Sequence, residues 1–197
     1  MAAPTEHEVL EALQATGAVL DGHFILSSGK HAARYIQCAR LLQHPYLAQR
    51  VCQLLGKRAQ ACGPIDAVVG PALGGILVAY ELARALGVRG LFTERQNGQM
   101  TLRRGFEIKE GERILIAEDV VTTGGSSLEI ANALRRYDAE VLGIACIVDR
   151  RPEGTQLPLS LISAIKLKID AFKPEDCPLC SQGIPTVKPG SKGEPSS

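Results

Sequence analysis

Apolar residues recur at helical spacing in several segments of the chain. Thr5 followed by Glu8 has the pattern of a capping box, which is typical of a helix start. Val9 and Leu13 then share one face, so we predict a helix at residues 5–16. The same spacing, with prolines or glycines near some of the ends, predicts further helices at residues 45–62, 74–87 and 125–138.

Continuous apolar runs alternate with these helices and predict buried strands. The runs lie at residues 65–70, 88–93, 113–119 and 140–150. Alternating strands and helices are typical of an α/β fold with a mostly parallel sheet flanked by helices, and such sheets bind ligands beyond the carboxyl ends of their strands. Residues 94–112 are polar, and Asn97-Gly98 within them predicts a turn or hairpin.

The segment at residues 22–37 has short apolar pieces interrupted by Ser27-Ser28-Gly29. This pattern predicts two short strands, or one strand and an irregular segment, that form a flap outside the main core. We expect a single domain at 1–187, with the flap at about 20–40, the core at about 46–154 and a disordered tail at 188–197.

Composition limits the classes of function that the chain can serve. Its 197 residues are 45% hydrophobic, which is enough for one substantial core. The net charge of +1 provides no overall field for nucleic acid or an anionic membrane, so any anion site must be local. The N-terminus lacks the pattern of a secretory signal and no apolar run is long enough for a membrane span, so we expect a cytoplasmic protein.

One stretch, ILIAEDVVTTGGSS at residues 114–127, combines two acids with a phosphate-type loop. The loop offers backbone N–H groups, hydroxyls and a helix N-terminus to an anion. By itself, Thr-Gly-Gly-Ser is more often the capped start of a helix. Glu118 and Asp119 change this interpretation, because carboxylates beside a phosphate repel it unless they hold hydroxyls or stabilise a developing cation.

This stretch resembles the phosphoribosyl-pyrophosphate signature of the type I phosphoribosyltransferases. The resemblance implies the type I fold, with a small N-terminal flap, or hood, subdomain. It also implies that Glu118 and Asp119 hold the ribose hydroxyls and take part in catalysis. The loop that binds the donor's 5-phosphate, with its flanking residues, is then Val120, Val121, Thr122, Thr123, Gly124, Gly125 and Ser126.

Three further stretches are similar to the orotate-specific members of this family. They are the flap at 22–37, VVGPALGGILVA at 68–79, which resembles the pyrophosphate loop, and IVDRRPEG at 147–154. The resemblance implies that Thr122 and Arg150 bind orotate, because a guanidinium group matches a planar carboxylate bidentately. Arg151 is expected to lie in solvent.

The activity that this resemblance implies is transfer of the phosphoribosyl group from phosphoribosyl pyrophosphate to orotate. The products are orotidine 5-monophosphate and pyrophosphate, in pyrimidine biosynthesis. Two alternatives stay open: a purine phosphoribosyltransferase on the same scaffold, and a non-catalytic regulator that retains the phosphoribosyl-pyrophosphate site. The balanced charge gives no support to a basic RNA-binding face.

The chain departs from the family where many members carry lysine. Ser27 stands in the flap, Gly74 stands in the pyrophosphate loop, and the loop at 94–104 has arginines but neither lysine nor histidine. Arg95 is the best positional match for the catalytic cation over the pyrophosphate. Magnesium is the expected cofactor, because it binds substrate phosphates without a dedicated protein cage. The family's loop crosses a dimer interface, so the resemblance also implies a homodimer.

The six cysteines lie mostly in apolar surroundings, which is typical of reduced thiols. Cys177 and Cys180 have the spacing of half a zinc site, but a structural zinc needs about four ligands, and no second pair is nearby in the sequence. We therefore predict no metal ligands and a minor structural role for the two thiols. We expect His23 and His31 to be hydrogen-bonded surface residues.

Overall fold

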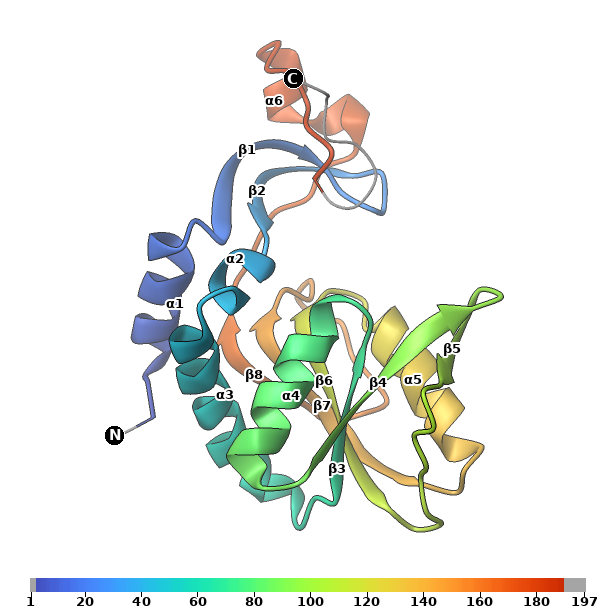
Figure 1. Ribbon diagram of the computed structural model, residues 1–197. Coiled ribbons are helices and arrows are strands. Elements are labelled where there is room, and N and C mark those ends of the chain that lie inside the picture. The colour runs from blue at the N-terminus through green and yellow to red at the C-terminus, as the bar shows by residue number, and fades with distance from the viewer. Residues whose placement is uncertain (1–2, 190–197) are drawn as a thin grey trace.

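The computed structural model describes residues 3–189 and has a six-stranded sheet at its centre (Figure 1). The strand order is β5-β4-β3-β6-β7-β8. Every neighbouring pair is parallel except the β4–β5 hairpin. The strands are β3 (Ala67–Pro71), β4 (Arg89–Gln96), β5 (Gln99–Leu102), β6 (Arg113–Val121), β7 (Glu140–Asp149) and β8 (Leu161–Lys166).

Helices cover both faces of this sheet, as the sequence predicted. α3 (Pro45–Ala59) and α4 (Gly74–Leu86) lie on one face, and α5 (Gly125–Arg135) lies on the other (Figure 1). Alternate residues of β6 serve the two layers: Leu115 belongs to the cluster with α3 and α4, whereas Ile116 belongs to the cluster with α5. This alternation follows from the two-residue period of a strand, so a run that is apolar throughout is buried on both faces.

The helix boundaries follow the sequence signals closely. In α1 (Glu6–Ala15) the capping box is confirmed: the Glu8 N–H donates to Thr5 Oγ1 at 3.3 Å, and the Thr5 N–H donates to Glu8 Oε2 at 2.7 Å. α3 begins at Pro45 and continues as a 3-10 turn, η1 (Gln60–Cys62). α4 ends at Gly87, whose φ of 72° suits glycine.

Two strands run further than the sequence predicted. β6 continues to Val121, because Val120 and Val121 still pair with Val148 and Asp149 of β7. The acids Glu118 and Asp119 therefore lie inside the strand, rather than at its carboxyl end as predicted. β4 continues to Gln96 and turns back at Asn97-Gly98 into β5, which confirms the hairpin. Strand β8 was not predicted, because no helix precedes it and its apolar run is short.

The flap consists of β1 (Val19–Ile25) and β2 (His31–Ile36), an antiparallel pair outside the main sheet. This pair confirms the prediction that the flap consists of two short strands, rather than one strand and an irregular segment. α2 (Ala39–Leu42) leads from the flap to the core, and the late segments η2 (Pro174–Asp176) and α6 (Pro178–Ser181) lie beside it (Figure 1). Backbone hydrogen bonds join His31 to Phe172 and His23 to Val187, so the last described segment borders both flap strands.

The predicted tail at 188–197 lies almost wholly outside the described residues, which end at 189. Within the described part of the chain, no helix is long and apolar enough to cross a membrane.

Candidate active site

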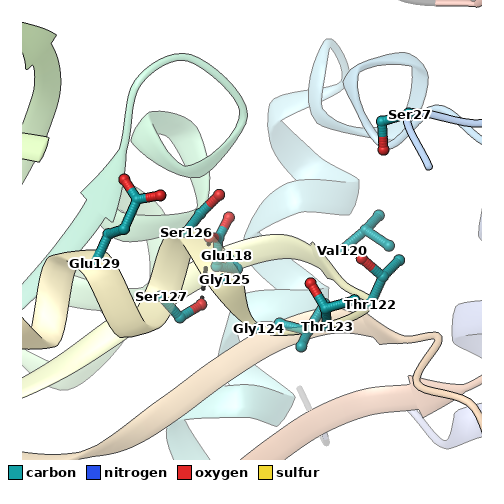
Figure 2. A pocket seen from close by; sticks show the side chains of 11 residues that line it. Ser27, Glu118, Val120, Thr122, Thr123, Gly124, Gly125, Ser126, Ser127 and Glu129 are labelled. Atoms are coloured by element: carbon teal, nitrogen blue, oxygen red, sulfur yellow. Dashed lines mark hydrogen bonds between the residues drawn. The ribbon is translucent and has the colours of Figure 1, made fainter. Parts of the chain in front are cut away.

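A polar pocket of about 290 Å³ opens at the carboxyl end of β6 (Figure 2). Most of its wall comes from one continuous segment, the end of β6, the following loop and the first turns of α5, and Ser27 lines it from the flap. The lining residues are Ser27, Glu118, Val120, Val121, Thr122, Thr123, Gly124, Gly125, Ser126, Ser127 and Glu129. The structure thus brings the predicted phosphate loop and Glu118 into one cavity.

The loop and the N-terminus of α5 have the geometry of an anion site. Gly124 has a φ of 74° and packs so closely on Leu157 that a β-carbon would lie 2.7 Å from its Cδ2 atom. Only glycine fits such a position without strain. No side chain caps α5 and its first turn carries no acid, so its free N–H groups and the positive end of its dipole face the pocket.

Glu118 lies at the back of this pocket and is 6% exposed. Its Oε1 atom accepts a hydrogen bond at 3.3 Å from the Oγ hydroxyl of Ser127, a residue in the first turn of α5 (Figure 2). Burial raises the pKa of Glu118 to about 8; the neighbouring charge of Asp119 adds to the effect, and the Ser127 hydroxyl opposes it. The carboxyl group therefore needs a partner that favours its charged form.

Asp119 follows on the opposite face of β6. Its Oδ1 accepts the N–H of Val120 at 2.8 Å, and its carboxyl group lies against Gly74 at the start of α4. Burial raises the pKa of Asp119, although backbone hydrogen bonds work in the other direction. The two acids thus point to different sides of the strand, one towards α5 and the other towards the pyrophosphate-type loop at α4.

Arg150 directly follows β7, the strand beside β6, and its backbone N–H donates to the Val121 carbonyl at 2.8 Å. It is partly buried, and burial lowers the pKa of its guanidinium while nearby Tyr35 works to raise it. Burial and the charge of Asp119 raise the pKa of Tyr35, and Arg150 opposes them. Tyr35 of the flap, Asp119 of β6 and Arg150 after β7 thus lie near enough to one another, at the carboxyl end of the sheet, for their charges to influence the pKa of Tyr35.

Arg151 does not lie free in solvent, and the prediction for it was wrong. Its Nε and Nη2 atoms donate to the two carboxylate oxygens of Asp149 at 3.0 and 2.9 Å. Burial alone would raise the pKa of Asp149, but hydrogen bonds from Arg151 outweigh it and hold that pKa below its ordinary value. Successive side chains after β7 point in different directions, so Arg151 pairs with Asp149 whereas Arg150 lies beside the pocket.

Arg95 lies on the β4–β5 hairpin and reaches towards the pocket. Its Nη2 forms an ion pair with Glu129 Oε2 at 2.9 Å, and its Nη1 donates to the Gly98 carbonyl at 2.6 Å. Glu129 itself lines the pocket. Arg104 instead donates through two nitrogens to Glu94, each at 2.8 Å. Arg95 is therefore the hairpin arginine that contacts the pocket wall.

His23 and His31 are buried, at 2% and 7% exposure, so the prediction that they lie at the surface was wrong. Neither lines the pocket. Both face Cys177 and Cys180, residues more than 140 positions away in the chain, and sequence spacing alone gave no signal of this contact.

Comparisons with known proteins agree with this geometry. The family model of the phosphoribosyl transferase domain matches residues 37–173. Orotate phosphoribosyltransferase from Pelotomaculum thermopropionicum is 51% identical over 188 residues, which cover 95% of this chain and 98% of that protein.

Solved structures of similar fold include members of the same family. Orotate phosphoribosyltransferase from Aeropyrum pernix matches with a TM-score of 0.66 and 30% identity, over 80% of this chain and 93% of that one. UMP synthase from Leishmania donovani matches with a TM-score of 0.71 and 25% identity, over 84% of this chain, which spans 37% of that longer one. With its fold, its phosphate loop and relatives that match along nearly their whole length, the chain belongs to the orotate phosphoribosyltransferase family.

Proposed function

We propose that the chain transfers the phosphoribosyl group of phosphoribosyl pyrophosphate to orotate, forming orotidine 5-monophosphate and pyrophosphate. The observation that carries this proposal is that Glu118, one of the paired acids of β6, shares a pocket with an uncapped phosphate-type loop at the start of α5. Membership of the orotate phosphoribosyltransferase family supports this reaction, and the position of Arg150, whose backbone N–H bonds to Val121 of the pocket wall, supports its proposed role in binding the orotate carboxylate.

The sugar donor would bind along β6 and α5. Its 5-phosphate would accept hydrogen bonds from Thr122, Thr123 and the N–H groups of residues 124–126, which lie at the positive end of the helix. The ribose hydroxyls would donate to Glu118 and Asp119. Both acids have raised pKa values without such partners, so hydroxyl donors and a developing cation favour their charged forms.

The reaction then depends on electrostatics. As the bond to pyrophosphate breaks, positive charge develops at the anomeric carbon and ring oxygen, and the two carboxylates stabilise it. Orotate is already an anion, so the protein needs only to hold its ring nitrogen opposite the leaving group. Arg150 would bind the orotate carboxylate and Thr122 would contact the ring, while Tyr35 and the flap cover it.

We further propose Mg²⁺ as cofactor. Every polar side chain that lines the pocket bears oxygen, which fits a hard cation, and the pyrophosphate of the substrate would supply the ligands of the ion. When bound, the ion would neutralise charge on the leaving pyrophosphate. Arg95 would add a second positive charge there, after exchanging its ion pair with Glu129 for the substrate.

We also propose that the protein acts as a homodimer in the cytoplasm. An apolar stripe of Leu73, Leu77 and Tyr80 runs along α4 and is between 50% and 82% exposed. A second copy of the chain would cover this stripe, in keeping with a family whose catalytic loop crosses a dimer interface. The six cysteines, all within the described residues, form no disulfide, which fits a reducing compartment.

A single assay tests the proposed reaction. Purified protein is mixed with orotate, phosphoribosyl pyrophosphate and magnesium, and the loss of orotate absorbance is followed. Turnover that depends on all three supports the proposal. Turnover with adenine or guanine but not with orotate would instead identify a purine enzyme, and binding of the donor without any turnover would identify a regulator.

A further inference from the structure

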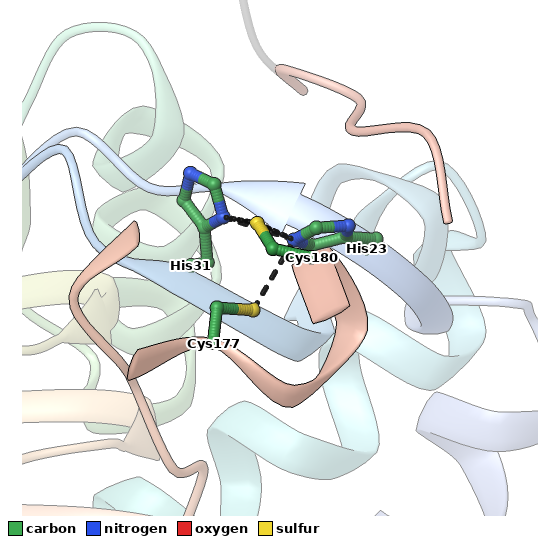
Figure 3. Close-up of side chains that lie close together, drawn as sticks. All are labelled: His23, His31, Cys177 and Cys180. Atoms are coloured by element: carbon green, nitrogen blue, oxygen red, sulfur yellow. Dashed lines mark hydrogen bonds between the residues drawn. The ribbon is translucent and has the colours of Figure 1, made fainter. Parts of the chain in front are cut away.

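Four potential metal ligands meet where the flap contacts the last described segment (Figure 3). His23 and His31 come from β1 and β2, and Cys177 and Cys180 come from the start and the body of the short helix α6. One donor atom from each residue lies within 4.8 Å of all the others. Three of the four side chains are buried, and Cys180 is exposed, which leaves a path for an ion to enter.

The separations between these donor atoms are close to those of a tetrahedral site. His23 Nε2 lies 2.9 Å from His31 Nδ1 and 3.4 Å from Cys177 Sγ. Cys180 Sγ lies 3.3 Å from His31 Nδ1 and 3.8 Å from His23 Nε2. Zinc bonds to nitrogen and sulfur at tetrahedral angles place such atoms about 3.3–3.8 Å apart. Shifts of less than about 1 Å would therefore complete the coordination.

The orientation of His23 supports a metal ligand rather than a simple hydrogen bond. Its Nδ1 lies 2.7 Å from the carbonyl oxygen of Ile184. Because a carbonyl can only accept, Nδ1 must carry the proton, and the neutral ring then presents a lone pair on Nε2 to the other three residues. A carbonyl that fixes the tautomer from behind is the usual outer partner of a zinc-bound histidine.

The segment that carries the two cysteines has almost no core of its own. Among the described residues after 170, only Cys177 is buried, and neither η2 nor α6 contains a buried residue. So little apolar burial cannot hold a short irregular segment in one conformation. Bonds from one ion to both flap strands and to α6 would supply the missing constraint.

From these contacts we infer that His23, His31, Cys177 and Cys180 form a structural zinc site. Two thiolates and two imidazoles in a tetrahedral arrangement favour zinc over oxygen-binding metals. All four positions are taken by protein, so the ion has no open position for catalysis. It fastens the flap to residues 172–187, on a different part of the flap from Ser27, which reaches the active-site pocket.

The first experiment uses the full wild-type chain, purified without chelator or a metal-affinity tag. Elemental analysis should give about one zinc per chain, and cobalt(II) in its place should give the strong visible absorption of a tetrahedral thiolate site. Protein without zinc that also fails to bind cobalt in this manner would overturn the inference. Stoichiometric iron, or a Cys177–Cys180 disulfide found by mass spectrometry, would do so as well.

Variants locate the ion. The double variant Cys177→Ser with Cys180→Ser, and separately His31→Ala, should lose the zinc. The control Cys62→Ser, which removes a thiol at the end of η1, should retain it. Hydrogen exchange should show β1, β2 and residues 172–187 losing protection on zinc removal, with the main sheet unchanged. Equal zinc loss in Cys62→Ser, or unchanged protection after removal of the ion, would contradict a site at this position.

Discussion

The carboxyl group of Asp119 lies directly against the backbone of Gly74: a β-carbon on Gly74 would fall 2.8 Å from Asp119 Oδ2. Because Gly74 is the first residue of α4, the Asp119 carboxyl group of β6 lies against the N-terminal end of that helix. It also explains why this chain cannot carry the lysine that many family members have at this position without moving Asp119.

Gly74→Ala should therefore impair catalysis more than folding. The added methyl group displaces the Asp119 carboxylate, and a displacement near 1 Å can cost roughly 100-fold in rate. We expect kcat/KM to fall at least about tenfold, with Tm within a few degrees of wild type. Gly56→Ala in α3 is the matched control, since its β-carbon meets Ala85 at an ordinary 3.5 Å. Equal activity in the two variants would refute the relationship.

Asp119→Asn removes the charge and preserves the shape. Asn can still accept the Val120 N–H, and the loss of a buried charge does not weaken the fold, because burial already raises the pKa of Asp119. We expect turnover to fall by about 100-fold or more, since one stabilising charge at the transition state is lost. Steady-state kinetics and thermal melting measure the two effects. Asp138→Asn, an exposed substitution after α5, serves as the control.

Glu118 should make the protein less stable at alkaline pH. Its pKa in the folded chain is about 8, above the ordinary value of 4.5, so the unfolded chain releases this proton first. The resulting stabilisation is complete below the unfolded pKa and is lost as the pH rises through about 8. The free energy of unfolding of Glu118→Gln should therefore exceed that of wild type by on the order of a few kcal/mol near pH 9. Near pH 4.5 the difference between the two proteins should be much smaller.

Urea denaturation without substrate at several pH values measures this difference. Glu110→Gln, in an exposed loop, should follow the wild-type curve throughout. A Glu118→Gln curve parallel to wild type from about pH 5 to pH 9 would show that the carboxyl group is not desolvated as described.

Neighbouring arginines should give opposite phenotypes. Arg150→Lys should raise the KM for orotate about tenfold or more and leave the KM for phosphoribosyl pyrophosphate unchanged, because lysine cannot bind a carboxylate bidentately. Arg151→Ala should instead destabilise the fold by about 2 kcal/mol, because it leaves the Asp149 carboxylate buried without its partner. Kinetics and urea denaturation on both variants separate these effects. If Arg151→Ala raised the KM for orotate and Arg150→Lys only lowered the stability of the fold, Arg151 and not Arg150 would be the residue that binds orotate.

The exposed stripe on α4 should control the oligomeric state. Leu77→Glu places a charge in its centre, so the variant should sediment as a monomer where wild type sediments as a dimer. Tyr137→Glu is the control, because that side chain is 43% exposed but lies outside the stripe. A monomeric wild type, or a dimeric Leu77→Glu variant, would exclude this interface.

Local patterns in the sequence determined most of the framework. The capping box at Thr5, the end of α4 at Gly87 and the hairpin at Asn97-Gly98 each depend on residues within a few positions of one another. The phosphate loop after β6 is equally local, so its residues could be named and their common pocket anticipated. The apolar run of β6 predicted burial on both faces, and the two core layers confirm it.

Tertiary structure alone decided the contacts between distant segments. His23 and Cys177 are 154 positions apart, and their meeting depends on how the last segment packs on the flap. The packing of α4 on β6 likewise placed Gly74 against Asp119, 45 positions further along the chain. Sequence periodicity reports which face of one element is buried; which faces then meet is set by the packing of the whole chain.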